Sequence, residues 1–355
     1  NCFTLFNMHP EDSSTTFSQE DHTQESSTSP NEETLSRPTL IEEYIKEDPT
    51  DVDLSGLRIF SLDEITESLE KFGTNVKSLS LKKNLVHDLT PLPDSVAQSL
   101  HTLDLYDNKI RHITNLENLT NLVKLDLSYN QIEKLEGLEK LENLEELYLV
   151  ENKISDLSGL KNLKKLRILE LGGNKLRRVP SDSLAGLTEL RELYLGKNKI
   201  TNLEIDFATL PNLATVSLSA NRLRAIPMHP FLNATSITQI YLAENGISSI
   251  DPKPLQNLKR LAVLDVSMNP ISSLEGIEEV ARDTLTQFWC TSAHISAYEE
   301  IQRLAKHSQL DTVFLEGNPI QTKETRYFYR VALLLPQVKN IDLNEVGDNL
   351  NEVRG

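Results

Sequence analysis

Apolar residues recur along most of the chain in one fixed pattern, L-x-x-L-x-L-x-x-N-x-[IL]. Four clear copies begin at Leu122, Leu144, Leu166 and Leu190. In each copy the L-x-L pair indicates a short strand, because strand side chains alternate between two faces with a period of two. An amphipathic helix does not explain the pattern, since an L-x-L pair with an asparagine three residues later does not fit a period of 3.6. We therefore expect short strands whose leucines all point toward one interior.

The asparagine of this pattern sets the register of the copies. It is found at Asn84, Asn108, Asn130, Asn152, Asn174, Asn198, Asn221, Asn245, Asn269 and Asn318. A further copy starts at Leu285, where Ala293 replaces the asparagine and Cys290 replaces the third leucine. The eleven copies are spaced by 22 to 25 residues. This spacing with this pattern is typical of the leucine-rich repeat.

Stacked copies of this unit predict an α/β solenoid, a leucine-rich-repeat horseshoe with a concave parallel β-sheet. One copy cannot bury its own apolar face, whereas neighbours bury each other's. We expect each asparagine amide to satisfy backbone groups of adjacent turns, because it offers both donors and an acceptor. Copies of 22 residues predict short 3₁₀ turns on the convex side. The later, longer copies contain proline and predict extended or turn segments there.

The two ends of the repeat region differ from its middle. Residues 1–50 contain eleven acidic and two basic residues. Such a composition, with few aromatic residues, predicts a disordered acidic tail. Residues 51–75 predict an N-terminal cap, in which a half copy of the repeat precedes a helical period at Ile65, Leu69 and Phe72.

The eleven repeats occupy residues 76–320, and residues 321–355 predict a C-terminal cap. A cap is expected at each end, because the last repeat must close an open sheet edge and an open core. The C-terminal cap should contain a helix and then a strand-like V-K-N-I-D segment. One face of that helix is expected to comprise Tyr327, Tyr329, Val331 and Leu334.

Charge and cysteine content narrow the classes of partner. The chain has 355 residues and a formal net charge of −17. This charge disfavours nucleic acid and anionic membranes as partners and favours a protein with a basic or mixed surface. Cys2 and Cys290 alone cannot form a disulfide framework or a metal site, so we expect an intracellular protein without a metal or cofactor. No run of about eighteen apolar residues exists, and no membrane span is expected.

Two further features concern processing. Residues 1–9 lack the charged region and apolar core of a signal peptide, and Met8 is a candidate natural start. Glycosylation-type triplets at Asn118 and Asn233 favour a secreted or receptor-like protein instead. Nuclear or cytoplasmic staining would exclude that alternative.

The sequence contains no recognisable catalytic motif. G-x-S-x-G, a glycine-rich phosphate loop and H-E-x-x-H are all missing. The eight histidines are scattered, and we expect His294 and His307 at the surface. We therefore expect a protein that is not an enzyme and has no catalytic or metal-binding residues.

The residues between the two leucines of each L-x-L pair should form a row along the concave sheet. This row is Ser80, Asp104, Asp126, Tyr148, Glu170, Tyr194, Ser217, Tyr241, Asp265, Trp289 and Phe314. Five of the eleven are aromatic and four are acidic, in a chain with only 6% aromatic residues. Aromatic side chains beside charges commonly anchor protein interfaces. The row therefore predicts a protein-binding surface.

Several stretches resemble the leucine-rich-repeat regulatory subunits of protein phosphatase 1, the regulatory subunit 7 family. The resemblance covers about residues 51–346. It is carried by DVDLSGLRI, LDLYDNKI, LYLVENKI, LELGGNK, LYLGKNKI, the Q-F-W of the tenth repeat, TVFLEGNPIQ and YRVALLLPQVKNID. The tryptophan repeat, the TVFLEGNP segment and the cap are its most specific parts.

The resemblance implies a non-catalytic subunit that binds the catalytic subunit of protein phosphatase 1 and modulates its activity or targeting in mitosis and chromosome segregation. It also implies a location in the nucleus and cytoplasm, and a monomer within a hetero-complex. The family's partner-binding positions would match Asp126, Tyr148, Glu170, Tyr194, Asp265, Trp289 and Phe314. Asp104 and Tyr241 of the row and Gln287 complete the predicted partner-binding set.

This sequence departs from the family's pattern in three places. Gln287 stands where the family has a glutamate, which removes one charge-assisted contact. Ala293 replaces the repeat asparagine, and several repeats have 24 residues instead of 22. The tail contains no [RK]-[VI]-x-[FW] docking peptide, so recognition would use the folded concave face. The alternative is a leucine-rich-repeat scaffold for a ciliary, tubulin or splicing assembly.

Overall fold

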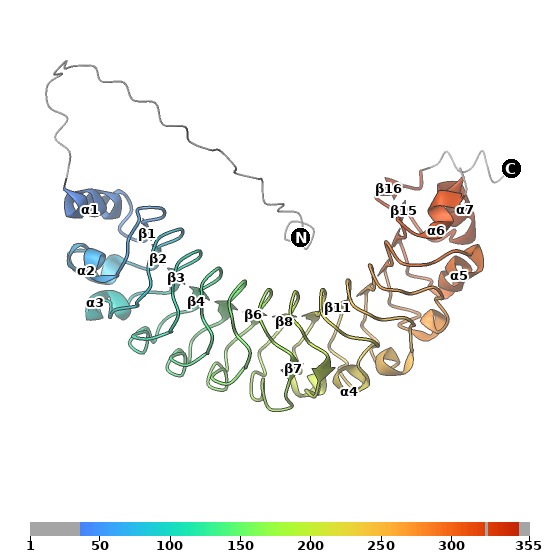
Figure 1. Cartoon of the computed structure of the whole chain (residues 1–355), viewed down its shortest axis with the longest axis horizontal. Helices are drawn as coiled ribbons and strands as arrows, with labels where there is room; N and C mark the ends of the chain where they lie inside the picture. The colour runs from blue at the N-terminus through green and yellow to red at the C-terminus, as the bar shows by residue number, and fades with distance from the viewer. Residues whose placement is uncertain (1–35, 324–325, 348–355) are drawn as a thin grey trace, which may run out of the picture. The chain divides into compact units, whose positions relative to one another are not determined.

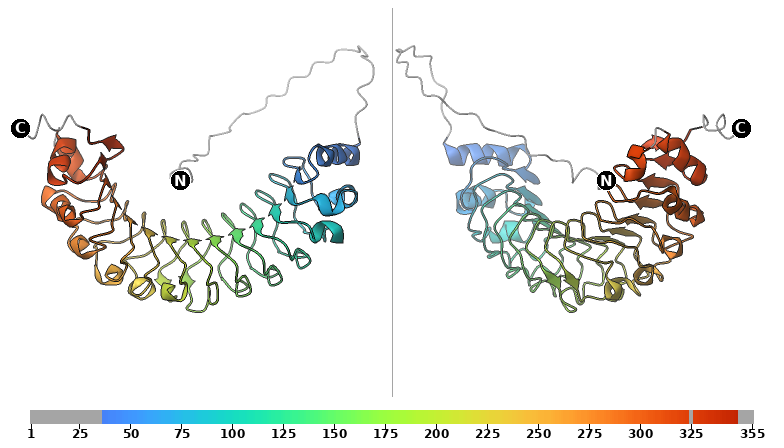
Figure 2. Two further views of the ribbon diagram at one scale, coloured as in Figure 1. Left: turned by 180° about the vertical axis from the view of Figure 1, so that it is seen from behind. Right: turned by 45° about the vertical axis from the view of Figure 1, so that its right-hand side comes forward.

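The computed structural model describes residues 36–323 and 326–347. From Arg37 onward these residues belong to one compact unit, in which the repeats stack side by side into a curved solenoid (Figure 1). A parallel sheet lines the concave side of this unit, and turns and short helices form its convex side. Helical caps lie at both ends of the arc (Figure 2).

Among the described residues fourteen strands form the main sheet, and their order in the sheet follows their order in the chain. β7 (Arg178–Val179) and β9 (Asn202–Leu203) form a separate two-stranded sheet. Every neighbouring pair is parallel apart from β15 and β16. The strands are β1 (Asp51–Asp53), β2 (Ser78–Ser80), β3 (Thr102–Asp104), β4 (Lys124–Asp126), β5 (Glu146–Tyr148), β6 (Ile168–Glu170), β8 (Glu192–Tyr194), β10 (Thr215–Ser217), β11 (Gln239–Tyr241), β12 (Val263–Asp265), β13 (Gln287–Trp289), β14 (Thr312–Phe314), β15 (Asn340–Ile341) and β16 (Asn344–Glu345).

Eleven of these strands, β2 to β6, β8 and β10 to β14, belong to the eleven repeats that the sequence predicts. The predicted leucine-rich-repeat horseshoe with a concave parallel sheet is therefore confirmed. The central residue of each repeat strand, such as Leu125, Leu147 or Leu169, is fully buried. Each repeat thus contributes an apolar residue from the same strand position, a leucine in most repeats, to one continuous core.

The convex side changes with repeat length. Repeats of 22 residues have only successive turns there, in which for example the Leu141 N–H donates to the Leu138 carbonyl at 3.0 Å. Other repeats have helices or a second, two-stranded sheet. These elements are α3 (Asp94–Ala97), η3 (Phe207–Thr209), α4 (Met228–Phe231), η4 (Lys253–Leu255), η5 (Ile277–Glu279), α5 (Tyr298–Gln302), η6 (Arg303–Lys306), β7 (Arg178–Val179) and β9 (Asn202–Leu203).

Two expectations for the later repeats need correction, one in part and one in full. The segment RRVPSDSLAGL has the predicted strand and turns, and Pro227 is extended, but in RAIPMHPFL the residues after Pro227 form the helix α4. Phe231 of that helix packs against Phe207 at 5.4 Å between ring centroids. His307 is not at the surface. It is fully buried, and its ring nitrogens lie 3.0 Å from the Val280 carbonyl and 3.3 Å from the Leu304 carbonyl.

The repeat asparagines tie each repeat to the preceding one, as predicted. The Asn152 amide nitrogen donates to the Leu127 carbonyl at 2.9 Å and to the Leu149 carbonyl at 3.2 Å. Its amide oxygen accepts the Ile132 N–H at 2.9 Å. The same arrangement recurs at the other repeat asparagines, including Asn130. Backbone groups buried by stacking therefore obtain partners that the strands themselves do not supply.

The residue before each asparagine has a left-handed backbone, which the sequence did not indicate. Glu151 has a φ of 52° and Tyr129 a φ of 56°. Two repeats have glycine at this position, at Gly173 and Gly317. A non-glycine residue in this region costs roughly 1–2 kcal/mol. The bend directs the asparagine inward, so its hydrogen bonds offset this local cost.

The N-terminal cap begins earlier than predicted. Helices α1 (Arg37–Glu47) and α2 (Asp63–Glu70) precede the first repeat, followed by η2 (Gly73–Asn75). Ile41 and Ile45 of α1 are buried, and Arg37 forms an ion pair with Glu64 at 3.0 Å. The prediction of a disordered tail over residues 1–50 is therefore wrong for α1 and for the residues that follow it. The rest of that predicted tail, residues 1–35, lies outside the described residues.

The C-terminal cap consists of α6 (Pro319–Lys323), α7 (Tyr327–Leu334), β15 and β16. Tyr327 and Val331 of α7 are buried, but Tyr329 is exposed, so the prediction that these three residues share one helical face is wrong for Tyr329. Asp342 accepts the Leu315 N–H at 2.6 Å and the Tyr327 hydroxyl at 2.7 Å. This carboxylate thus joins the last repeat to the helix that covers its core.

We expect Asn152→Ala to lower the free energy of unfolding by about 2 kcal/mol, because the Ile132 N–H and the Leu127 carbonyl lose a buried partner. Chemical denaturation followed by circular dichroism measures this change. The control is Asn162→Ala, since Asn162 donates one bond to the Glu139 carbonyl on the convex side. Equal losses in the two variants would contradict the special role of the repeat asparagine.

Ala293→Asn is expected to stabilise the protein by about 1 kcal/mol. At present the Ile271 N–H, which would face the asparagine of the next repeat, donates at 2.7 Å to the Asn269 carbonyl of its own repeat. Ala293 is buried, so a new amide there would be shielded from water. A denaturation midpoint at or below that of the wild type would show that the tenth repeat has adapted to alanine.

Candidate functional site

The acid–aromatic row predicted from the sequence lies on the concave face in the expected register. We keep this name for the third residues of the eleven repeat strands, Ser80 to Phe314. In each repeat strand the central residue is buried, and in most of them the first and third residues are partly exposed. Strand pairing aligns the third residues directly, as in Asp126 with Tyr148 and Tyr148 with Glu170. Nine of the ten predicted contact residues lie in this row, and Gln287 is the first residue of β13.

Three rings form a cluster at the C-terminal end of the row. The Tyr241 and Trp289 centroids are 5.9 Å apart, and the Trp289 and Phe314 centroids are 5.2 Å apart, both in edge-to-face arrangements. Asp265 lies between Tyr241 and Trp289 in the strand register and is 7% exposed. Its two neighbours therefore cover it, and burial raises the pKa of its carboxyl. Rings, and not this carboxylate, form the accessible surface here.

The tyrosines of the row extend back along their own strands. The Tyr148 hydroxyl donates to Glu146 at 3.0 Å, and the Tyr194 hydroxyl donates to Glu192 at 2.7 Å. Burial and the bond to Glu146 raise the pKa of Tyr148, so its hydroxyl remains a donor at physiological pH. Lys124 lies 5.0 Å from the centre of the Tyr148 ring. These contacts hold the rings in place and reduce the entropy that binding would cost.

Glu170 lies in register between Tyr148 and Tyr194 at the middle of the sheet. Its Oε1 accepts the Gly172 N–H at 2.9 Å. A Cβ on Gly172 would lie 2.9 Å from the same oxygen, so glycine makes room for the folded-back carboxylate. Burial raises the pKa of Glu170 to about 7, against the opposing effect of the Gly172 bond. A positively charged partner would favour the ionised form of this group.

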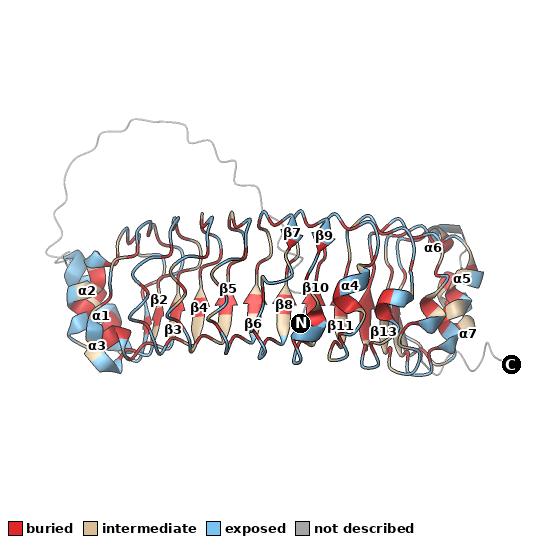
Figure 3. Cartoon of the chain, turned by 90° about the horizontal axis from the view of Figure 1, so that it is seen from below, coloured by how far each residue is buried: buried red, intermediate tan, exposed pale blue. Residues whose placement is uncertain are grey.

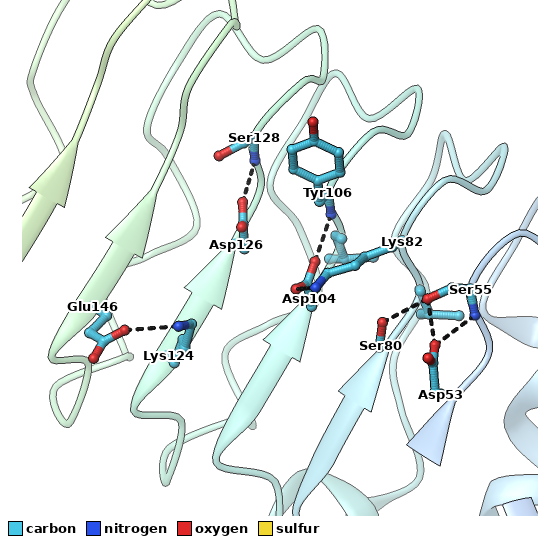
Figure 4. Close-up of polar contacts among 12 residues, drawn as sticks. Asp53, Ser55, Ser80, Lys82, Asp104, Tyr106, Lys124, Asp126, Ser128 and Glu146 are labelled. Atoms are coloured by element: carbon cyan, nitrogen blue, oxygen red, sulfur yellow. Dashed lines mark hydrogen bonds and ion pairs between the residues drawn. The ribbon is translucent and has the colours of Figure 1, made fainter. Parts of the chain in front are cut away.

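The N-terminal end of the row is a polar network (Figure 4). Lys82 forms an ion pair with Asp104 at 2.9 Å, and Asp104 also accepts the Tyr106 N–H at 3.1 Å. Asp126 accepts the Ser128 N–H at 2.8 Å, and burial raises the pKa of its carboxyl. Lys82 thus balances the charge of Asp104, whereas the Asp126 side chain is partly exposed and bonded to the Ser128 N–H.

Two features of this face escaped the sequence analysis. Glu146, Glu192 and Gln239, the first residues of their strands, hold the tyrosine hydroxyls. The period of two in a strand could have placed them on the same face. The second is a ring contact between Tyr106 and Tyr129, with centroids 4.9 Å apart. No sequence signal could have revealed it, because it depends on the left-handed backbone of Tyr129.

The concave face offers contact surface, hydrogen-bond acceptors and rings. Within the described part of the chain, no group of three or more His, Cys, Asp or Glu side chains is placed to bind a metal. Across those same residues, no helix has the length and apolar character to span a membrane. Cys290 is buried, which raises the pKa of its thiol to about 12.

Comparison with known proteins supports the repeat assignment. The family pattern described as "Leucine rich repeat" matches residues 142–200 and 211–271. The pattern described as "Leucine Rich repeats (2 copies)" matches residues 98–140 and 188–232. Similarity to solved structures agrees: an internalin (inlF) from Listeria monocytogenes is 26% identical, with a TM-score of 0.64, and the match covers 84% of this chain and 82% of the internalin.

Two curated relatives share short segments with this chain. Protein phosphatase 1 regulatory subunit SDS22 of Schizosaccharomyces pombe is 38% identical over 60 residues, which is 16% of this chain and 18% of that protein. The protein of the same name from Saccharomyces cerevisiae is 37% identical over 75 residues, 21% of either chain. The matches thus span about a fifth of each relative.

Glu170→Gln is expected to flatten the pH dependence of stability. The folded chain holds the Glu170 proton more tightly than the unfolded chain, since its pKa is about 7 instead of 4.5. The stabilisation from this carboxyl is therefore complete below pH 4.5 and is lost as the pH rises through 7. Between pH 5 and 8 the wild type should lose on the order of 2 kcal/mol more than the variant.

Urea denaturation at the two pH values measures this difference. Glu189→Gln is the matched control, because Glu189 is an exposed glutamate away from the row. Its pH dependence should equal that of the wild type. A Glu170→Gln variant that behaves in the same way would disprove the assigned pKa.

Proposed function

We propose that this leucine-rich-repeat protein is a non-catalytic regulatory subunit that binds the catalytic subunit of protein phosphatase 1 through its concave face. The observation that carries the proposal is the acid–aromatic row, with its three-ring cluster around Trp289. The partial similarity to two proteins named protein phosphatase 1 regulatory subunit SDS22 supports this choice of partner. Those matches cover about a fifth of each relative, so the partner and the regulatory activity are themselves part of the proposal.

Two parts of the row would make different kinds of contact with the partner. Trp289, Tyr241 and Phe314 form an apolar anchor at the C-terminal end, where a partner can remove a large area from water. Asp126 and Glu170 carry acceptors at the centre, and both lie beside the Tyr148 strand. A basic surface on the phosphatase would therefore meet carboxylates and rings in alternation, which favours Lys or Arg side chains.

Binding of a cation at Glu170 is linked to proton release. At pH 7 the carboxyl is about half protonated, because its pKa is about 7. A partner Lys or Arg stabilises the ionised form and lowers that pKa. The affinity should therefore rise from pH 6 to pH 8, provided that the partner's own groups do not titrate.

The proposal includes a biological setting. The protein would act as a monomer within a hetero-complex in the nucleus and cytoplasm, and would modulate phosphatase activity or targeting in mitosis and chromosome segregation. No nucleic acid, membrane or cofactor takes part in this function.

A scaffold for a ciliary, tubulin or splicing assembly is the second candidate. Gln287 favours it, because a neutral amide stands two residues before Trp289, where the regulatory subunit 7 family has a glutamate. The covered Asp265 favours it too, since this carboxylate reaches a partner only if the rings move. Affinity purification of the tagged protein with mass spectrometry separates the two candidates.

Trp289→Ala and Glu170→Lys are expected to weaken binding to the purified phosphatase catalytic subunit, each by at least about 2 kcal/mol, or roughly thirtyfold. The tryptophan variant loses the apolar anchor, and the lysine variant places a cation where a cation should bind. Calorimetry on the full chain measures both dissociation constants.

The controls change the same residue types elsewhere. Tyr329→Ala removes an exposed ring from α7, and Glu189→Lys reverses an exposed charge outside the row. Both should bind the phosphatase as the wild type does. The proposal fails if wild type does not bind, or if the concave variants bind as well as the controls.

A further inference from the structure

Four cations stand in line on one flank of the solenoid, beside the concave face. They are the residues that follow the repeat asparagine in four successive repeats. We call them the basic ladder: Lys153, Lys175, Lys199 and Arg222. Lys175, Lys199 and Arg222 are exposed, and Lys153 is partly exposed.

Backbone hydrogen bonds fix the spacing of the ladder. The Lys175 N–H donates to the Ile154 carbonyl at 2.8 Å, and the Lys199 N–H donates to the Leu176 carbonyl at 2.8 Å. The Arg222 N–H continues the series with a bond of 3.0 Å to the Ile200 carbonyl. The backbone N–H of each of these ladder residues thus donates to the carbonyl of the residue that directly follows the previous ladder residue. The side chains are presented one per repeat on a rigid backbone.

Further cations widen this surface. Arg177, Arg178 and Arg224 are all exposed. Arg178 lies in β7, where it pairs with Asn202 of β9, and these two strands form an exposed edge of the solenoid (Figure 3). The small second sheet therefore stiffens the segment that carries Arg177 and Arg178.

The surface contrasts with the charge of the whole protein. Residues 153–224 contain thirteen basic and seven acidic residues, a net charge of +6, whereas the remaining residues of the chain sum to −23. Within the part of the chain that the structure describes, the ion pairs do not include any ladder residue. Like charges on adjacent repeats repel one another. An anionic partner would remove this repulsion.

We propose that the basic ladder binds an extended acidic segment of a partner polypeptide, whose Asp or Glu carboxylates pair with successive repeats. Three steps of about 4.8 Å give a length of about 14 Å, which four or five extended residues span. This surface goes beyond the proposed phosphatase function, because it uses a flank and leaves the concave row free. One protein could then hold two partners at once.

The surface suits a peptide better than a nucleic acid. Single strands are usually bound by basic grooves with aromatic side chains on which bases stack. The exposed aromatic residues in the described part of the chain are Tyr44, Phe60, Tyr129 and Tyr329, and all lie outside residues 153–224. A longer polyanion would also extend onto acidic repeats on either side, which would repel it.

The test uses the full chain and a fluorescein-labelled peptide of about ten residues with alternating Glu and Ser. Fluorescence anisotropy gives its affinity for the wild type and for the double variant Lys175→Glu, Lys199→Glu. We expect the double variant to bind at least about ten times more weakly, because two attractive charges become repulsive. A peptide with Gln in place of Glu should not bind. Rising salt should weaken binding of the Glu peptide to the wild type.

The matched control is Lys161→Glu, Lys164→Glu, which alters two exposed lysines in the segment before β6. Each double variant changes the net charge from −17 to −21, since each Lys→Glu substitution subtracts two. The control should keep its affinity within about twofold. Circular dichroism verifies the fold, and Lys175→Gln, Lys199→Gln replaces the ladder variant if that variant does not fold.

Three outcomes would overturn the proposal. The first is an absence of measurable binding of the Glu peptide to the wild type. The second is an equal loss in the ladder variant and the control, which would indicate a general charge effect. The third is ladder-dependent binding of a single-stranded oligonucleotide that is tighter than binding of the peptide, which would assign the surface to nucleic acid.

Discussion

The hydrogen bonds of one buried asparagine per repeat are the interaction on which this structure depends. Stacking short strands buries backbone groups in the loops that leave the sheet, and these groups need partners. Asn130 and Asn152 each donate to carbonyls in two repeats and accept one N–H from the preceding repeat. Leucine burial supplies most of the driving force, but the asparagine fixes the position of one repeat on the next. The positions of the concave side chains follow from that alignment.

This alignment gives the concave face its regular spacing, and the residues that point outward from the strands differ from repeat to repeat. Positions on the concave face lie outside the leucine core, so they can carry rings in one repeat and carboxylates in the next. Tyr148, Glu170 and Tyr194 show the result, since neighbours in the row alter each other's burial and hydrogen bonding. The backbone that follows the repeat asparagines is aligned in the same way, and it carries Lys175 and Lys199 on one flank. Two surfaces of opposite charge therefore coexist on one scaffold.

Sequence reasoning worked where a residue's role repeats and failed where it depends on one place. The strands, their register and the row follow from a period that eleven copies reinforce. Helix α1 was missed, because Ile41 and Ile45 alone mark its buried face within a polar, acidic stretch. The burial of His307 depends on contacts of its ring with the Val280 and Leu304 carbonyls. Val280 is distant in the sequence, and a backbone carbonyl leaves no sequence signal. The covering of Asp265 by its neighbours is a matter of side-chain conformation, which periodicity does not encode.

The alanine in the tenth repeat has a consequence for how the protein comes apart. In a one-dimensional stack, cooperativity passes only through contacts between neighbours, so the weakest junction sets where the chain divides. The Asn269 carbonyl takes the Ile271 N–H that a side chain of the next repeat accepts elsewhere, so the junction of β12 and β13 has fewer ties. Under load or mild denaturant, the last repeats would detach there as a block. This junction lies directly beside Trp289 of β13.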